Sequence, residues 1–252
     1  MQSFVFSNAK GGVGKTTSAV SVAFNLSQNG YKTLLIDLDF QVNATIALGA
    51  YQSPNALQSL RTVTTPIEAL VRPTSYPQLD IVPADINLAA GCDFQPTELT
   101  WLRQQLRLLN PYDFVIIDTS PTWNFLVKSA LIAADYVIIP TTPTTWAREG
   151  VLTFAQNLAL LRQEVPTVAR ILGVLLTQVR SDTQLELIES LRQELGDTVF
   201  QTEISYSPKV AAAEVKPLAI AAPKTKANQR YLALTIELLD RIGAHNATTS
   251  YS

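Results

Sequence analysis

Cysteine and histidine are almost absent from this chain of 252 residues, which contains one of each, Cys92 and His245. A single cysteine cannot form a disulfide within the chain or an all-cysteine metal site, and we expect Cys92 to be a small buried apolar side chain. The only histidine lies in a polar C-terminal stretch. The composition therefore excludes a disulfide framework and argues against catalysis by histidine.

Charge and long apolar runs are also scarce. Charged residues make up 16% of the chain and the net charge is −2, so only a local basic patch is expected to bind nucleic acid. No stretch reaches the roughly 18 apolar residues that would suggest a membrane span, and residues 1–6 do not resemble a signal peptide. The hydrophobic content of 47% is enough for a large core. We expect a cytoplasmic globular protein without a membrane span.

Short apolar segments alternate with longer amphipathic ones, which is typical of parallel β-α-β units. The predicted strands are residues 3–7, 33–37, 79–83, 114–118, 136–140 and 171–177. The predicted helices are residues 15–29, 97–109, 123–134, 148–164, 183–195 and 226–242. We predict an α/β fold with a single doubly wound, mostly parallel sheet flanked by helices. One domain covers residues 1–243, and residues 244–252 form a disordered polar tail.

A glycine-rich loop joins the first predicted strand to the first predicted helix. Residues 10–17 read Lys-Gly-Gly-Val-Gly-Lys-Thr-Thr, a compact variant of G-x-x-x-x-G-K-[ST] with Ala9 in place of the first glycine. Glycines let successive backbone N–H groups turn toward an anion, and the positive end of the helix adds attraction. The predicted phosphate contacts include Lys15 on the β- and γ-phosphates, the Thr16 hydroxyl on Mg²⁺ and Thr17 on the α-phosphate. The complete predicted set in the loop is Lys10, Gly11, Gly12, Val13, Gly14, Lys15, Thr16 and Thr17.

Three aspartates follow predicted strands. Asp37 and Asp39 end the second strand and Asp118 ends a later one, so all three should lie at the sheet edge that carries the loop. Asp118 has the pattern of a Walker B acid, which holds Mg²⁺ directly or through water. Asp39 is placed to orient or activate water at the γ-phosphate, and Asp37 could do either or support the metal from outside its ligand shell. The predicted metal set is Thr16, Asp37 and Asp118.

These motifs make the chain resemble the ParA/MinD family of deviant Walker-type ATPases over residues 4–242. Residues 10–16 are similar to the family's loop with Lys10 at its signature lysine, and residues 35–45 and 112–118 resemble its second and third motifs. The resemblance implies a P-loop NTPase that binds ATP and Mg²⁺ and pairs two subunits around two nucleotides, each Lys10 reaching the other's phosphates. It also implies Lys10, Lys15 and Asp39 as catalytic residues, with Ser205 and Tyr206 close to the adenine.

Several positions depart from the family pattern. Phe40 stands where proline is usual and Val42 where glycine is usual. Ser120 and Ser205 each replace a proline, and Ser129 replaces an asparagine. These departures concern the switch loop and the base contacts, and they leave the phosphate loop intact.

A local basic patch supplies a candidate DNA surface. Residues 204–230 hold five basic side chains and one acid, and such an excess favours contact with a phosphate backbone. The resemblance matches Arg192 and Lys209 to positions that hold non-specific DNA in ParA proteins. The predicted DNA contacts are Arg192, Lys209, Lys224 and Lys226. Dimerisation would join two weak patches into one bivalent surface, so DNA affinity would follow the ATP state.

The resulting hypothesis is a nucleoid-associated ATPase that positions or segregates a plasmid, a chromosome or a protein body and is released when a ParB-like partner stimulates hydrolysis. A MinD-like membrane ATPase is an alternative, but residues 246–252 lack the charge and apolar face of a basic amphipathic helix. An ATP-dependent metabolic enzyme of the same superfamily stays open. A nitrogenase-reductase-like carrier is excluded because one cysteine cannot supply two cluster ligands per subunit.

Overall fold

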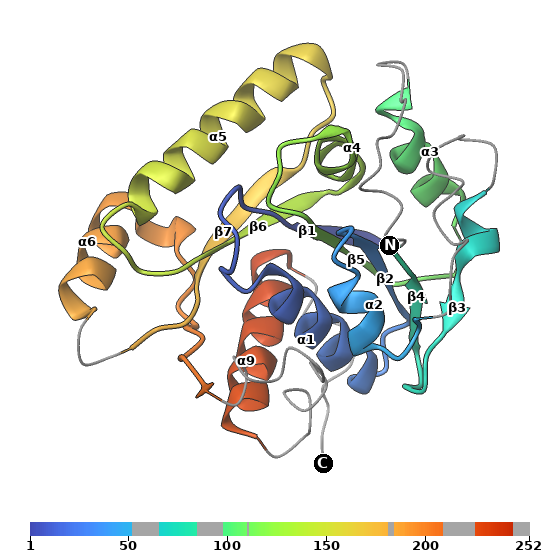
Figure 1. Cartoon of the computed structure of the whole chain (residues 1–252), viewed down its shortest axis with the longest axis horizontal. Coiled ribbons are helices and arrows are strands. Elements are labelled where there is room, and N and C mark those ends of the chain that lie inside the picture. Colours follow the sequence, from blue (N-terminus) through green and yellow to red (C-terminus); the bar gives the residue numbers. More distant parts are fainter. Residues whose placement is uncertain (52–65, 85–97, 110, 181–183, 209–224, 244–252) are drawn as a thin grey trace.

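The computed structural model describes residues 1–51, 66–84, 98–109, 111–180, 184–208 and 225–243. Its strands form one seven-stranded sheet in the order β3-β4-β2-β5-β1-β6-β7 (Figure 1), and all neighbours are parallel except the edge pair of β3 and β4. The strands are β1 (Gln2–Phe6), β2 (Thr33–Leu38), β3 (Arg72–Pro73), β4 (Leu79–Val82), β5 (Phe114–Thr119), β6 (Tyr136–Thr141) and β7 (Arg170–Leu176). The predicted single, mostly parallel sheet is confirmed.

Helices cover both faces of this sheet (Figure 1). Their bounds are α1 (Lys15–Gln28), α2 (Asn43–Ala47), α3 (Trp101–Leu108), α4 (Phe125–Ala133), α5 (Ala147–Glu164), α6 (Leu185–Leu195) and α9 (Lys226–Arg241). Side chains of α1, α2 and α9 share one apolar cluster with the sheet, and those of α3, α4, α5 and α6 share a second. Because both faces are covered, the central strands β2 and β5 are buried along their whole length, as their apolar runs predict.

The register of the central strands brings the predicted site together. In the parallel ladders, Asp118 at the end of β5 is the partner of Asp37 on β2 and of Phe6 at the end of β1. The glycine-rich loop follows β1 directly. One sheet edge therefore carries both the loop and the acidic strand ends, which is where open parallel sheets bind their ligands.

Most element boundaries lie close to the predicted ones, and the differences have local causes. Helix α4 begins at Phe125, two residues late, because the Asn124 side chain accepts a 3.0 Å hydrogen bond from Val127 N and so caps the helix. Helix α1 ends at Gln28, one residue before the predicted end, and Gly30 at φ +87° follows its C-cap Asn29. The sequence missed α2, β3 and the 3-10 helices Ile67–Leu70 and Gly196–Thr198, which are too short to show a periodicity.

Some expectations fall outside the described residues, namely those for Cys92, His245 and the tail of residues 244–252. The helices within the described ranges include none with the length and apolar character needed to cross a membrane.

Glycine is required at one position of β7. A Cβ on Gly173 would lie 2.5 Å from Phe200 Cε2 and 2.9 Å from a guanidinium nitrogen of Arg241. Both neighbours are held in place. Phe200 is fully buried and its N–H bonds Val174 O at 2.9 Å, and the Arg241 guanidinium donates 3.0 Å hydrogen bonds to Leu172 O and Val199 O. The missing side chain thus lets the segment around Phe200 pack directly against the sheet.

Gly173→Ala is expected to lower the free energy of unfolding by about 1–3 kcal/mol, because the added methyl overpacks a site that cannot yield. Gly150→Ala is the matched control: this glycine lies in α5 with open space around it, and the change should raise stability by up to about 1 kcal/mol. Denaturant unfolding of both variants tests the difference. Equal effects at the two glycines would contradict the packing argument.

Candidate nucleotide-binding site

The loop between β1 and α1 has the backbone that its glycines allow. Gly12 and Gly14 take φ values of +71° and +80°, a region that residues with side chains rarely adopt. Gly14 is also the N-cap of α1 and has no side chain to cap it. The loop thus leads into a helix N-terminus whose first N–H groups point outward, the arrangement that binds phosphate.

The loop is braced by side chains that follow β1 and β7. Thr177 donates a 2.8 Å hydrogen bond to Val13 O, and the Gln178 amide donates to Gly12 O. Asn8 accepts from Lys10 N at 3.0 Å and donates to Pro140 O at 2.7 Å. The sequence analysis missed Asn8, Thr177 and Gln178. Their bonds hold the loop in shape before any ligand arrives, which is the preorganisation that anion binding needs.

The side chain of Lys15, the residue that ends the loop and begins α1, lies against the loop backbone. This side chain is buried, and Nζ donates a 3.0 Å hydrogen bond to Lys10 O. Burial lowers the pKa of Lys15, while the charges of Asp118 and Asp39 act in the opposite direction. The predicted phosphate lysine therefore lies between the loop and the acidic strand ends.

Asp37 is fully buried and its oxygens are occupied. Oδ1 accepts from Asp39 N at 3.0 Å, and Oδ2 accepts from the N–H of Thr45 at 2.9 Å and from its hydroxyl at 2.7 Å. Burial raises the pKa of Asp37 to about 6 although these hydrogen bonds favour the ionised form. Among the roles left open for Asp37, this geometry favours the supporting one, since the carboxylate fixes residues 39–45 and the start of α2.

Asp118 is as fully buried as Asp37, but only one of its carboxylate oxygens accepts a hydrogen bond within the described ranges. Oδ1 accepts a 3.0 Å hydrogen bond from Thr119 N, whereas Oδ2 accepts none from the part of the chain that the structure describes. Burial, and then the charge of Asp37, raise the pKa of Asp118 well above its ordinary value, and Thr16 and Lys15 oppose the rise. A buried carboxylate oxygen without a donor is open to a cation.

The donor set at this point suits Mg²⁺. Magnesium prefers oxygen ligands and is held by one or two protein oxygens with phosphates and waters completing the shell. Asp118 Oδ2 and the hydroxyl of Thr16 fit that requirement. Among the described residues, no group of three or more His, Cys, Asp or Glu could hold a metal by itself. The site therefore suits a metal that arrives with a phosphate ligand.

A cavity of about 430 Å³ extends from the loop. Its phosphate end is lined by Gly11, Gly12, Gly14, Lys15, Thr16 and Thr17. Its other end is lined by Ile204, Ser205, Tyr206, Ser207, Ala227 and Tyr231. The predicted residues Ser205 and Tyr206 thus lie on the same cavity as the loop, while Lys10 is exposed and outside the lining. The volume and the two ends suit a nucleoside triphosphate.

Asp39 also lines the cavity, beside a strained turn. Its Oδ1 accepts a 3.0 Å hydrogen bond from Gln41 N, which leaves the carboxylate at the cavity wall. Val42 follows at φ +52°, an unusual conformation for a β-branched residue. This is one of the positions at which the chain departs from the family's glycine. The turn that holds Asp39 therefore carries backbone strain.

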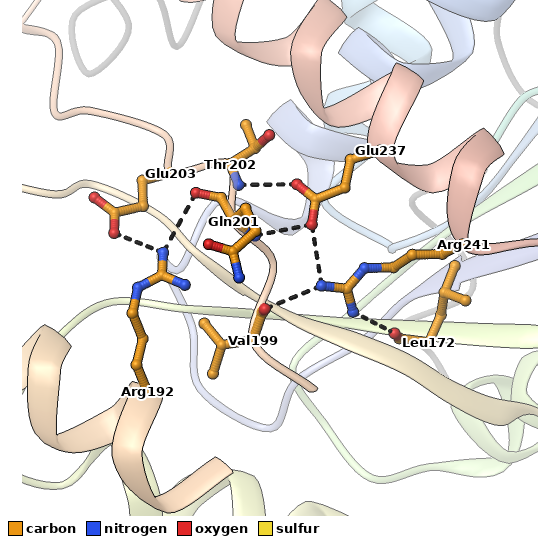
Figure 2. A network of polar contacts seen from close by, with 8 residues as sticks. All are labelled: Leu172, Arg192, Val199, Gln201, Thr202, Glu203, Glu237 and Arg241. Carbon is orange, nitrogen blue, oxygen red and sulfur yellow. Dashed lines mark hydrogen bonds and ion pairs between the residues drawn. The ribbon is translucent and has the colours of Figure 1, made fainter. Parts of the chain in front are cut away.

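The structure does not bring the predicted DNA-binding residues together into one surface within the described ranges. Arg192 donates to Glu203 Oε1 at 2.8 Å and to Gln201 O at 3.3 Å, so its guanidinium is already paired (Figure 2). Lys226 is exposed at the first position of α9. Lys209 and Lys224 lie outside the described residues. The structure thus brings the loop and acidic residues together, and the DNA surface stays a prediction.

Replacing each buried aspartate by asparagine should have opposite effects. Asp118→Asn is expected to raise the free energy of unfolding at neutral pH by about 1–3 kcal/mol without nucleotide, because it removes a poorly compensated buried charge. Asp37→Asn should lower it by about 1–3 kcal/mol, because the amide nitrogen would face backbone and hydroxyl donors. Denaturant unfolding in buffer without Mg²⁺ measures both. A shift of the same sign in the two variants would refute the distinction.

Known proteins share this architecture and much of this sequence. A family model described as an AAA domain matches residues 1–171. The sporulation initiation inhibitor protein Soj of Bacillus subtilis is 32% identical over 241 residues, covering 92% of this chain and 95% of Soj. The chromosome-partitioning ATPase Soj of Thermus thermophilus is 34% identical, covering 93% and 94%.

A solved structure extends the likeness to a complete nucleotide site. Cobyrinic acid a,c-diamide synthase of Mycobacterium smegmatis with a bound ATP analog and magnesium superimposes with a TM-score of 0.81 at 25% identity, covering 100% of both chains. Nucleotide and magnesium thus occur together in a protein of the same fold. On the family match and the identity to the Soj proteins, the chain belongs to the ParA/MinD family of deviant Walker-type ATPases.

Proposed function

We propose that this protein is a ParA-like ATPase that dimerises on ATP, binds DNA non-specifically and positions or segregates a cargo. The observation that carries the proposal is the convergence of the phosphate loop and Asp39 on one cavity, with the buried carboxylate of Asp118 at the same edge of the sheet. The chromosome-partitioning role of its Soj relative supports the choice of process.

In the proposed reaction, the chain's own groups bind and orient the nucleotide. The loop N–H groups and Lys15 hold the phosphates, and the Thr16 hydroxyl with Asp118 holds Mg²⁺. The metal, when bound, neutralises charge on the β- and γ-phosphates. Asp39 at the cavity wall orients the water that attacks the γ-phosphate, and Asp37 holds the turn that carries Asp39. Water is the nucleophile, and ADP and phosphate are the products.

Lys10 has a separate role in the proposal. It is exposed and lies outside the lining of its own cavity, while its backbone oxygen anchors Lys15. Its ammonium reaches the phosphates of a second subunit, so that triphosphate occupancy favours pairing. A cation delivered across an interface is an established way to couple nucleotide state to association.

The remaining parts of the proposal concern partners and place. The DNA contacts are Arg192, Lys209, Lys224 and Lys226, which become one bivalent surface in the dimer. A ParB-like adaptor stimulates hydrolysis and thereby releases the DNA. The protein acts in the cytoplasm at the nucleoid, and the cargo is a plasmid, a chromosome or a protein body.

A metabolic ATP-dependent enzyme is the second candidate. It is favoured by the likeness to cobyrinic acid a,c-diamide synthase over the full length of both chains. Such an enzyme would bind ATP·Mg²⁺ at the same site and need neither DNA nor ATP-dependent pairing. Association state therefore separates the two candidates.

Sedimentation velocity with a non-hydrolysable ATP analog and Mg²⁺ is expected to show a dimer, and ADP a monomer. Lys10→Ala should stay monomeric while still binding the analog, because only the contact to the partner's phosphates is lost. Lys32→Ala is the control, since this lysine precedes β2 at the opposite edge of the sheet. A monomer with both nucleotides would favour the metabolic candidate.

Lys226→Ala is expected to weaken binding to all duplex DNA sequences alike and to reduce the slope of log affinity against log salt by about 1, because one phosphate contact is lost. Arg192→Ala should act similarly, with nucleotide affinity measured in parallel because Arg192 also contacts residues 201 and 203. Lys128→Ala in α4, which lies on the face of the sheet opposite α9, is the control for Lys226→Ala. A loss confined to particular sequences would contradict the non-specific surface.

A further inference from the structure

Residues 199–207 form the wall of the cavity that lies away from the phosphate loop, and we call them the wall segment. Their last four residues, Ile204 to Ser207, line the cavity. The segment runs beside β7 and touches it at two points: Phe200 N bonds Val174 O, and Ile204 N bonds Leu176 O, both at 2.9 Å. The position of this wall fixes how much room a nucleoside has.

Between these two points the wall segment has a partner from outside the sheet. The N–H groups of Gln201 and Thr202 each donate a 2.8 Å hydrogen bond to the carboxylate of Glu237, one to each oxygen (Figure 2). Glu237 belongs to α9 and its side chain is only 17% exposed. Burial disfavours its ionised form, but the bonds from residues 201, 202 and 241 outweigh this and hold the pKa of Glu237 below its ordinary value. The carboxylate thus replaces the strand neighbour that these N–H groups lack.

Arg241 fixes Glu237 and joins three parts of the chain. Its guanidinium donates 3.0 Å hydrogen bonds to Glu237 Oε1, to Val199 O and to Leu172 O of β7 (Figure 2). The same group lies 4.1 Å from the centre of the Phe200 ring. One side chain of α9 therefore contacts the wall segment, the sheet and the carboxylate that holds the wall.

The same helix supplies further lining residues at this end of the cavity. Ala227 and Tyr231 of α9 line it together with the wall segment's last residues, and Glu237 and Arg241 follow further along α9. Tyr231 is tied to α1 through its hydroxyl, which lies 3.4 Å from Ser18 Oγ. The pair of Glu237 and Arg241 therefore sets the distance between two groups of lining residues, and none of its contacts reaches the phosphate loop.

We propose that Glu237 and Arg241 are positioning residues that set the nucleoside end of the cavity independently of its phosphate end. This inference rests on the proposed binding of ATP. Two charge-assisted hydrogen bonds hold the wall, and such bonds are shorter and stronger than neutral ones. Without them the N–H groups of Gln201 and Thr202 lose their partners, and the lining residues that follow lose their fixed place.

The test compares two ligands that share only the phosphate end. Calorimetry measures the affinity of the full chain for ATP·Mg²⁺ and for inorganic tripolyphosphate·Mg²⁺. Glu237→Ala should weaken ATP binding by about tenfold and leave tripolyphosphate binding within about twofold. Glu237→Gln, which keeps one acceptor oxygen, should weaken ATP binding by a smaller factor, and Arg241→Lys should resemble Glu237→Gln. Glu189→Ala, an exposed glutamate of α6, should change neither affinity.

The outcomes separate this inference from the one on which it rests. Parallel losses for both ligands in Glu237→Ala and Glu237→Gln would show that the pair only stabilises the fold, and unchanged ATP binding in both variants would overturn the positioning role. In either case wild-type binding of ATP would leave the proposed ATPase intact. If the wild-type chain bound neither ligand, the proposed function itself would fail and this inference with it.

Discussion

Two carboxylates lie side by side in the interior, and the rest of the site depends on how their charges are balanced. Asp37 and Asp118 are register partners on β2 and β5, and neither is exposed to solvent. Asp37 is balanced by three hydrogen bonds from residues 39 and 45, whereas one oxygen of Asp118 has no donor among the described residues. Such a group is costly in an empty site and is stabilised by a cation. The acidic edge is thus built for a ligand that brings positive charge.

The phosphate loop and the nucleoside end depend on separate supports. The loop is braced by Asn8, which follows β1 and bonds Pro140 O of β6, and by Thr177 and Gln178, which follow β7. It belongs to the same sheet edge as the carboxylates. The opposite end of the cavity is held from α9 by Glu237 and Arg241. The two ends of the cavity can therefore change independently, and Ser205, one of the departures from the family pattern, lies at the nucleoside end.

The sequence predicted what depends on local order and missed what depends on distant contacts. Strand and helix order, the glycine loop and the acidic strand ends follow from periodicity and from the rule that parallel strands share an edge. The brace between Asn8 and Pro140 joins residues 132 positions apart, and no local pattern reveals it. Glu237 has the sequence context of a surface helix residue, and Arg192, predicted as a DNA contact, is paired with Glu203. The DNA surface stays a prediction because two of its four residues lie outside the described ranges.

A crystal structure with a non-hydrolysable ATP analog and Mg²⁺ tests the central claim most directly. The account predicts the triphosphate on the N–H groups of residues 11–16, with the metal between the Thr16 hydroxyl and the free oxygen of Asp118. It also predicts that the hydrogen bonds that Thr45 donates to Asp37 persist, because that carboxylate supports the turn and does not bind the metal. A metal held by Asp37 with Asp118 uninvolved, or a nucleotide bound away from the loop, would contradict it.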